Sequence, residues 1–307
     1  MMKLQSIHSI LVLVMASTAS VFGQDWATPT RLTFDPAQDG FPTWSPDGTF
    51  LLHSCFSWKD SVGRNGIWKI PLDGKQSTQV FSGIAEHPQL SPDGRLIVFD
   101  SDTGASMSMI DANGGTPKKF LPDSVAIRNG GLPIWSPAGS QIAFKDASGF
   151  LCVYDMNSGK VAAIFHEEGS VPLPGCWSKD GKYVLYALMN RQTRASTMWK
   201  ISVDGKEREQ ITGHREGFYR YLALSPDGTM LAYAAMEGRN LGLWVMPAQG
   251  GESLPLAITR PGHNESPAWS PDGTRLAFTS TRSGNFDIWL MDLDVQRLQH
   301  ELQSVNK

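Results

Sequence analysis

The chain has 307 residues, of which 41% are hydrophobic and 19% are charged, so it has ample apolar material for a large core and does not have the composition of a disordered protein. Its formal net charge of -3 supplies no positive field for nucleic acid, which we therefore exclude as a partner. The 30 glycines, 19 prolines and 10 tryptophans indicate many short strands joined by turns, because glycine and proline interrupt helices. These features favour an all-β protein.

Residues 1–23 have the pattern of a secretory signal peptide. Lys3 precedes an apolar stretch at residues 10–16, and small residues follow as far as Gly23. The apolar stretch is too short to span a bilayer. No later segment approaches about 18 uninterrupted apolar residues, so we expect a mature protein that is not transmembrane and that lies in the periplasm or is secreted.

The three cysteines are an odd number for an exported chain, so at least one is unpaired. Cys55 and Cys152 lie in the apolar, strand-like runs LLHSCF and FLCVYDM, and Cys176 is the third. Cysteine in such runs usually behaves as a small buried hydrophobe. We expect no disulfide and no catalytic thiol.

A five-residue motif occurs six times along the chain, as WSPDG, LSPDG, WSPAG, WSKDG, LSPDG and WSPDG. The copies follow one another at intervals of about 45 residues, a spacing that indicates a propeller or a solenoid. Proline sets φ for a tight turn, aspartate accepts bonds from nearby amides, and glycine accepts a positive φ. We interpret the motif as a hairpin turn, and its aspartates as structural rather than catalytic.

The runs between the turns predict strands. Each turn is followed by a β-rich run such as LIVFDS or LAFTST, then by a second run such as IWKIPL or IWLMDL, and in five units by a third run. With the short run before each turn, every unit has four strands, which predicts an all-β, six-bladed β-propeller over residues 24–294. The sixth unit lacks its outer strand. Residues 28–34, TPTRLTF, can supply it and close the ring, and residues 295–307 form a C-terminal tail or a short helix.

The repeat resembles the TolB-type, PD-repeat β-propellers of bacterial periplasmic and secreted proteins. The resemblance covers roughly residues 28–293 and rests on NESPAWSPDGTRLAFTSTRSGNFDIWLMDLD at 264–294, with weaker copies elsewhere. It implies the propeller fold, while similar blades serve several functions. TolB itself carries an extra N-terminal α/β domain, whereas here the leader runs almost directly into TRLTF, so we expect a propeller without that domain.

The loops that join one blade to the next share a face with the loops between the second and third strands of each blade, and function usually lies on such loops. These loops pair histidine with acidic residues four times, and they also carry arginines and a long aromatic segment. The candidate binding residues are Trp58, Glu86, His87, Arg128, His214, Glu216, Arg220, His263 and Glu265.

Two functions remain open. The first is a binding module, expected to be monomeric, whose loop face and central channel hold a protein or cell-envelope ligand without a cofactor. The alternative is a metal-dependent enzyme of the polysaccharide lyase or hydrolase type, in which His87, His214 and His263 bind a divalent ion at the channel mouth. We favour binding over an enzyme, because histidines after glycine also recur in repeat proteins as braces of their own turns. The chain has no G-x-S-x-G elbow of a peptidase.

Overall fold

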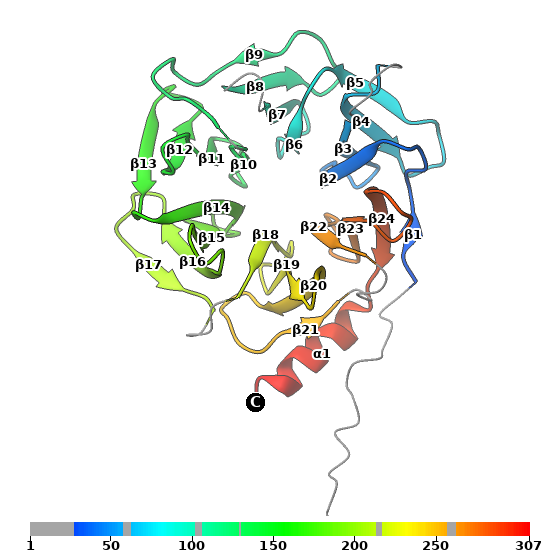
Figure 1. The fold of residues 1–307 in the computed structure, drawn as a ribbon, viewed down its shortest axis with the longest axis vertical. Coiled ribbons are helices and arrows are strands. Elements are labelled where there is room, and N and C mark those ends of the chain that lie inside the picture. Colours follow the sequence, from blue (N-terminus) through cyan, green and yellow to red (C-terminus); the bar gives the residue numbers. More distant parts are fainter. Residues whose placement is uncertain (1–27, 58–62, 102–105, 129, 213–216, 257–261) are drawn as a thin grey trace, which may run out of the picture.

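The computed structural model describes residues 28–57, 63–101, 106–128, 130–212, 217–256 and 262–307. In these ranges the strands form six antiparallel four-stranded sheets, which are arranged as the blades of a ring (Figure 1). The predicted all-β, six-bladed propeller is confirmed.

The strands of each blade follow one another from the centre of the ring outward. Blade 1 contains β2 (Gln38–Trp44), β3 (Phe50–Phe56), β4 (Gly66–Pro71) and β5 (Thr78–Ser82). Blade 2 contains β6 (Glu86–Leu90), β7 (Leu96–Ser101), β8 (Ser106–Asp111) and β9 (Lys118–Lys119). Blade 3 contains β10 (Ile134–Trp135), β11 (Gln141–Lys145), β12 (Leu151–Asp155) and β13 (Val161–Phe165).

Blades 4 and 5 repeat this order, and blade 6 takes its outer strand from the other end of the chain. Blade 4 contains β14 (Ser170–Trp177), β15 (Tyr183–Asn190), β16 (Ser196–Ser202) and β17 (Arg208–Gln210). Blade 5 contains β18 (Tyr219–Leu224), β19 (Met230–Glu237), β20 (Asn240–Pro247) and β21 (Leu254–Pro255). Blade 6 contains β22 (Asn264–Trp269), β23 (Arg275–Ser280), β24 (Asp287–Asp292) and β1 (Thr30–Arg31).

The closure of the ring is as the sequence predicts. β1 pairs antiparallel with β24, with Thr30 opposite Leu290 and Arg31 opposite Trp289. The Leu32 amide extends the pairing by donating to the Ile288 carbonyl at 2.8 Å. Closure covers the edge of β24, so that blade 6, like the other blades, ends in a short outer strand.

The repeated motif forms the turn between the first and second strands of each blade. In all six turns the serine hydroxyl accepts the amide of the residue five positions later, at 2.9–3.0 Å. In the five turns that contain aspartate, the carboxylate accepts the serine hydroxyl. Where the motif begins with tryptophan, the indole N–H donates to an inner-strand carbonyl of the preceding blade, as Trp44 does to Ala268 at 2.9 Å.

The apolar core lies between neighbouring blades rather than in one central mass. For example, Leu52 and Ile67 of blade 1 pack with Ile97, Phe99 and Ile110 of blade 2, and all five are at most 2% exposed. This layering follows from the alternation of side chains along each strand, which gives each blade two faces to cover.

The last segment of the chain is a helix, α1 (Val295–Val305), which lies beside blades 5 and 6 (Figure 1). Asp294 caps it by accepting the Arg297 amide at 3.0 Å. Its residues Leu298 and Leu302 are buried in the apolar layer between those two blades. At 11 residues α1 is shorter than a bilayer-spanning helix, and the described ranges hold no other α-helix.

Candidate functional site

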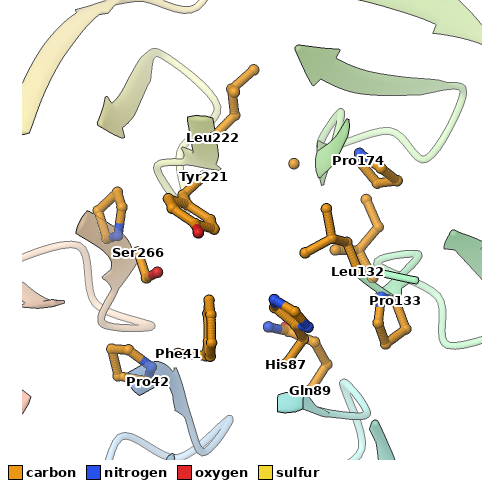
Figure 2. Close-up of a pocket in the computed structure, with 13 residues that line it drawn as sticks. Phe41, Pro42, His87, Gln89, Leu132, Pro133, Pro174, Tyr221, Leu222 and Ser266 are labelled. Carbon is orange, nitrogen blue, oxygen red and sulfur yellow. The ribbon is translucent and has the colours of Figure 1, made fainter. Parts of the chain in front are cut away.

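A pocket lies at the centre of the ring, where the inner strands of all six blades meet (Figure 2). The empty space in and around it is about 470 Å³, including solvent-filled space at its mouth. The wall is mainly apolar and rich in proline, with a few polar groups. It consists of Phe41, Pro42, His87, Gln89, Leu132, Pro133, Ile134, Pro174, Gly175, Tyr221, Leu222, Ser266 and Pro267.

One repeat position supplies the side chains that point into this pocket. It is the fourth residue before the serine of each turn, and its six occupants are Phe41, His87, Leu132, Pro174, Tyr221 and Ser266. All of these except proline have a positive φ, between 48° and 55°. Such a conformation costs a non-glycine residue about 1 kcal/mol or more.

A β-bulge accompanies this unusual backbone. The register between the first and second strands shifts at this position in blades 1, 2, 4, 5 and 6. A bulge turns one side chain out of the normal alternation. In these five blades it directs a side chain toward the axis, where Phe41 lies with its ring centroid 4.1 Å from that of His87 and 5.8 Å from that of Tyr221 (Figure 2).

His87 is held by a buried carboxylate from the second strand of its own blade. Its Nδ1 lies 2.9 Å from Oδ1 of Asp100, which is 1% exposed. Oδ2 of the same carboxylate accepts the backbone amides of Gly131 and of Leu132, the latter at 2.9 Å. Asp100 therefore fixes both the imidazole of blade 2 and the backbone at Leu132 of blade 3.

The charges of this pair support each other. Burial acts against a charge on His87, yet the Asp100 carboxylate, with help from Glu86, raises the pKa of His87 above its ordinary value. Burial also acts against a charge on Asp100, but the imidazole and the two amides lower the pKa of Asp100 below its ordinary value. The pocket thus contains an oriented, cation-favouring imidazole over a buried anion.

Two more ionisable groups lie beside the pocket. Burial raises the pKa of Glu265, while the charge of Arg220 partly opposes this effect. The guanidinium of Arg220 lies 4.7 Å from the ring centroid of Tyr221 and 5.8 Å from that of Phe218. Arg220 therefore connects the aromatic part of the wall with the acidic group of the next blade.

The remaining residues predicted from the sequence are placed differently. The imidazole of His263 bonds the backbone of the preceding blade, since its Nδ1 accepts the Leu241 amide at 3.2 Å. The side chain of Arg128 is exposed and does not line the pocket, although its carbonyl accepts Lys145 Nζ at 3.0 Å. Trp58, His214 and Glu216 lie outside the described residues.

The structure also groups side chains that could hold a metal. Glu86, His87 and Asp100 each place one ligand-type atom within 4.8 Å of the others. His263 is not part of this group, among the residues described. Since Asp100 already accepts two amides and the imidazole, its capacity for a metal is small.

Comparison with known proteins places the fold. No protein-family model matches the chain. An uncharacterised protein of Agrobacterium fabrum is 28% identical over 208 residues, which are 64% of this chain. The chain spans 65% of the length of that relative.

Solved structures match over most of the chain. The structure of a putative TolB from Agrobacterium tumefaciens superposes with a TM-score of 0.62 at 21% identity, over 85% of this chain and 92% of that one. TolB from Acinetobacter baumannii gives 0.59 at 18% identity, over 83% of this chain and 64% of that one. The chain has a TolB-like β-propeller fold.

The TolB-like fold is shared by proteins of other functions. Oligogalacturonate lyase from Vibrio parahaemolyticus superposes with a TM-score of 0.61 at 13% identity, over 87% of this chain and 93% of that one. Since this score is almost equal to that of the putative TolB, the fold alone does not separate a binding protein from an enzyme. The function must therefore be inferred from the side chains of this TolB-like propeller.

Proposed function

We propose that the protein is an exported binding module, and that its central pocket takes an extended segment or a chain end of a partner protein. The observation that carries this proposal is the ring of six side chains that one repeat position places at the axis. Five of its six members have a positive φ. Backbone strain of this kind gathers at ligand-binding sites, where it sets side chains in a fixed arrangement.

The chemistry of the wall supports a protein ligand. Phe41 and Tyr221 offer flat apolar surfaces with little conformational entropy to lose, which is typical of anchors at protein interfaces. His87 and Arg220 add polar contacts that can orient a bound segment. Export is supported by the signal-peptide pattern of residues 1–23 and by the likeness to TolB.

A random peptide library displayed on phage tests the proposal. Peptides enriched on the purified protein should bind at least tenfold more weakly to the Tyr221→Ala and Phe41→Ala variants, because the anchor contacts are lost. Tyr183→Ala is the matched control, because Tyr183 does not line the pocket. It is the first residue of β15, and its hydroxyl donates to Oε2 of Glu207 at 2.6 Å. Titration calorimetry measures each affinity.

Three outcomes would count against this function. Peptides that bind equally well to both pocket variants would place the site elsewhere. Binding of soluble cell-wall glycans in place of peptides, weakened by Tyr221→Ala, would make the ligand an envelope component. A stoichiometric metal that His87→Gln removes, with no peptide binding, would favour the metal-dependent enzyme, for which the Glu86, His87 and Asp100 group is the supporting observation.

A further inference from the structure

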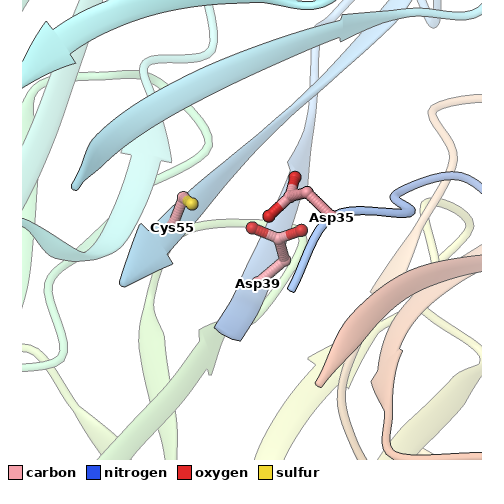
Figure 3. Close-up of side chains that lie close together, drawn as sticks. All are labelled: Asp35, Asp39 and Cys55. Carbon is pink, nitrogen blue, oxygen red and sulfur yellow. The ribbon is translucent and has the colours of Figure 1, made fainter. Parts of the chain in front are cut away.

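A second group of ionisable side chains lies away from the pocket, at the seam where the ring closes. Asp35 follows β1, Asp39 is in β2, and Cys55 is in β3, directly opposite Asp39 in the register of the two strands. The three side chains point toward one another (Figure 3). One ligand-type atom from each lies within 4.8 Å of the other two.

Asp39 is the unusual member of this group. It is 0% exposed, and among the described residues neither of its carboxylate oxygens has a hydrogen bond of normal geometry. An ionised carboxylate in such a place costs several kcal/mol unless a cation or hydrogen bonds compensate it. Burial, with the nearby negative charge of Asp35, raises the pKa of Asp39 to about 7.

The neighbouring cations do not compensate Asp39. Arg64 forms an ion pair with Asp35, and Arg31 forms one with Asp287 at 2.9 Å. His53 lies with Nδ1 3.5 Å from Oδ1 of Asp39, and the same nitrogen lies 3.1 Å from the Ser54 carbonyl oxygen. Among the described residues, Asp39 is therefore a fully buried carboxyl group without a hydrogen-bond partner.

We propose that Asp35, Asp39 and Cys55 bind a divalent transition-metal ion of the zinc type, which fastens the closure of the ring. A thiolate combined with carboxylates suits zinc, whereas calcium and magnesium prefer oxygen ligands alone. The Asp35 side chain is 22% exposed, so an ion can reach the site from solvent and can keep a water ligand. This site is independent of the central pocket.

The position of the site explains what the ion would do. Asp35 belongs to the segment that leaves the last blade, while Asp39 and Cys55 belong to the first blade. Backbone and side-chain bonds already cross here, as from the Asp39 amide to the Phe286 carbonyl at 2.9 Å. A metal that binds the folded ring and not the unfolded chain adds its binding free energy to that closure.

The test uses the whole purified protein, first stripped with a chelator and then titrated with Co²⁺ and with Zn²⁺. We expect one equivalent to bind, with a cobalt–thiolate charge-transfer band in the near ultraviolet, and a higher temperature of thermal unfolding with Zn²⁺. Cys55→Ser should lose the band, and Asp39→Asn should bind at least tenfold more weakly. Cys152→Ser is the matched control, because Cys152 is a buried cysteine in blade 3, outside the group.

The Asp39→Asn variant also distinguishes a loss of metal binding from a folding defect. It removes the buried carboxylate at nearly constant volume, so its metal-free form should unfold at or above the temperature of the metal-free wild type, and the same concentration of Zn²⁺ should raise it less than it raises the wild type. The proposal is overturned if the wild type shows no thiolate band, or if the band persists in Cys55→Ser. It is also overturned if only His87→Gln removes the ion, because that result places the metal in the central pocket.

Discussion

Asp100 shows how one side chain can organise two blades. It accepts hydrogen bonds from His87 in its own blade and from the amides of Gly131 and Leu132 in the next blade. Thr279 has the same repeat position in blade 6, and its hydroxyl accepts the Phe41 amide of blade 1 at 3.2 Å. In both cases a polar residue of the second strand accepts the amide of the positive-φ residue in the next blade and holds it in place.

The ion pair of His87 and Asp100 predicts a specific dependence of stability on pH. The folded-state pKa of His87 is raised above 6.5, so its contribution is fully present below pH 6.5 and is lost as the pH rises through the folded-state value. The pKa of Asp100 is lowered below 3.8, so its contribution is lost only when the pH falls through that lower value. Between pH 4 and 6, the free energy of unfolding of the wild type should be about 2 kcal/mol higher than that of His87→Gln.

Denaturant unfolding of wild type and His87→Gln at a series of pH values measures this difference. It should shrink as the pH rises above 6.5 toward and past the folded-state pKa of His87. His300→Gln is the control, because His300 is exposed on α1 and should give no such trend. A difference that does not change with pH would show that His87 has the same pKa in the folded and unfolded states, and would contradict the ion pair.

The turn between the first and second strands is the element that the sequence describes best. Its serine, aspartate and glycine act within a few residues of one another, so the chemistry can be read without knowing the fold. Blade 3 is the exception. Its turn has Ala138 where five others have aspartate, so the Ser136 hydroxyl lacks the acceptor found in those turns.

Ala138→Asp should therefore stabilise blade 3. The new carboxylate would accept the Ser136 hydroxyl and the Ser140 amide, as Asp272 accepts Ser270 and Thr274 in blade 6. We expect the free energy of unfolding to rise by about 0.5–1 kcal/mol, measured by denaturant titration at pH 7. Ala138→Asn is the matched control, and an unchanged or lower stability of the aspartate variant would show that the turns are not equivalent.

The bulges of the inner strands were not predictable from local pattern. The residues at this position range from Phe41 to Ser266 and share no side-chain chemistry. Five of the six share a positive φ, and hydrogen bonds between blades hold the backbone at Phe41 and Leu132. Sequence reasoning found Glu86, His87, Arg220 and Glu265 through their charge. It missed Phe41, Leu132 and Asp100, whose roles depend on strands that pair or pack far apart in the chain.

The architecture of the whole ring was predictable because it repeats. Six turns with three or four strand-like runs each required a closed array, and the missing outer strand of the sixth unit pointed to residues 28–34. The packing of α1 was not predictable to the same degree. Val295–Val305 is short, and its burial depends on an apolar layer that forms only when blades 5 and 6 meet.

Closure should contribute strongly to the stability of the ring. In Leu32→Pro, the amide that donates to the Ile288 carbonyl is absent, and the pairing of β1 with β24 is disturbed. We expect this variant to lose about 2 kcal/mol more free energy of unfolding than Leu32→Ala, which removes only the side chain. Thermal and denaturant unfolding give the comparison, and equal losses in the two variants would mean that β1 is dispensable for the closed ring.

The joining of β1 to β24 also has a consequence for biosynthesis. Thr30 leaves the ribosome early, but its partner Leu290 is translated near the end of the chain. Contacts of such long sequence separation form slowly, because a large loop must close first. The nascent polypeptide therefore cannot complete its ring until translation is almost finished.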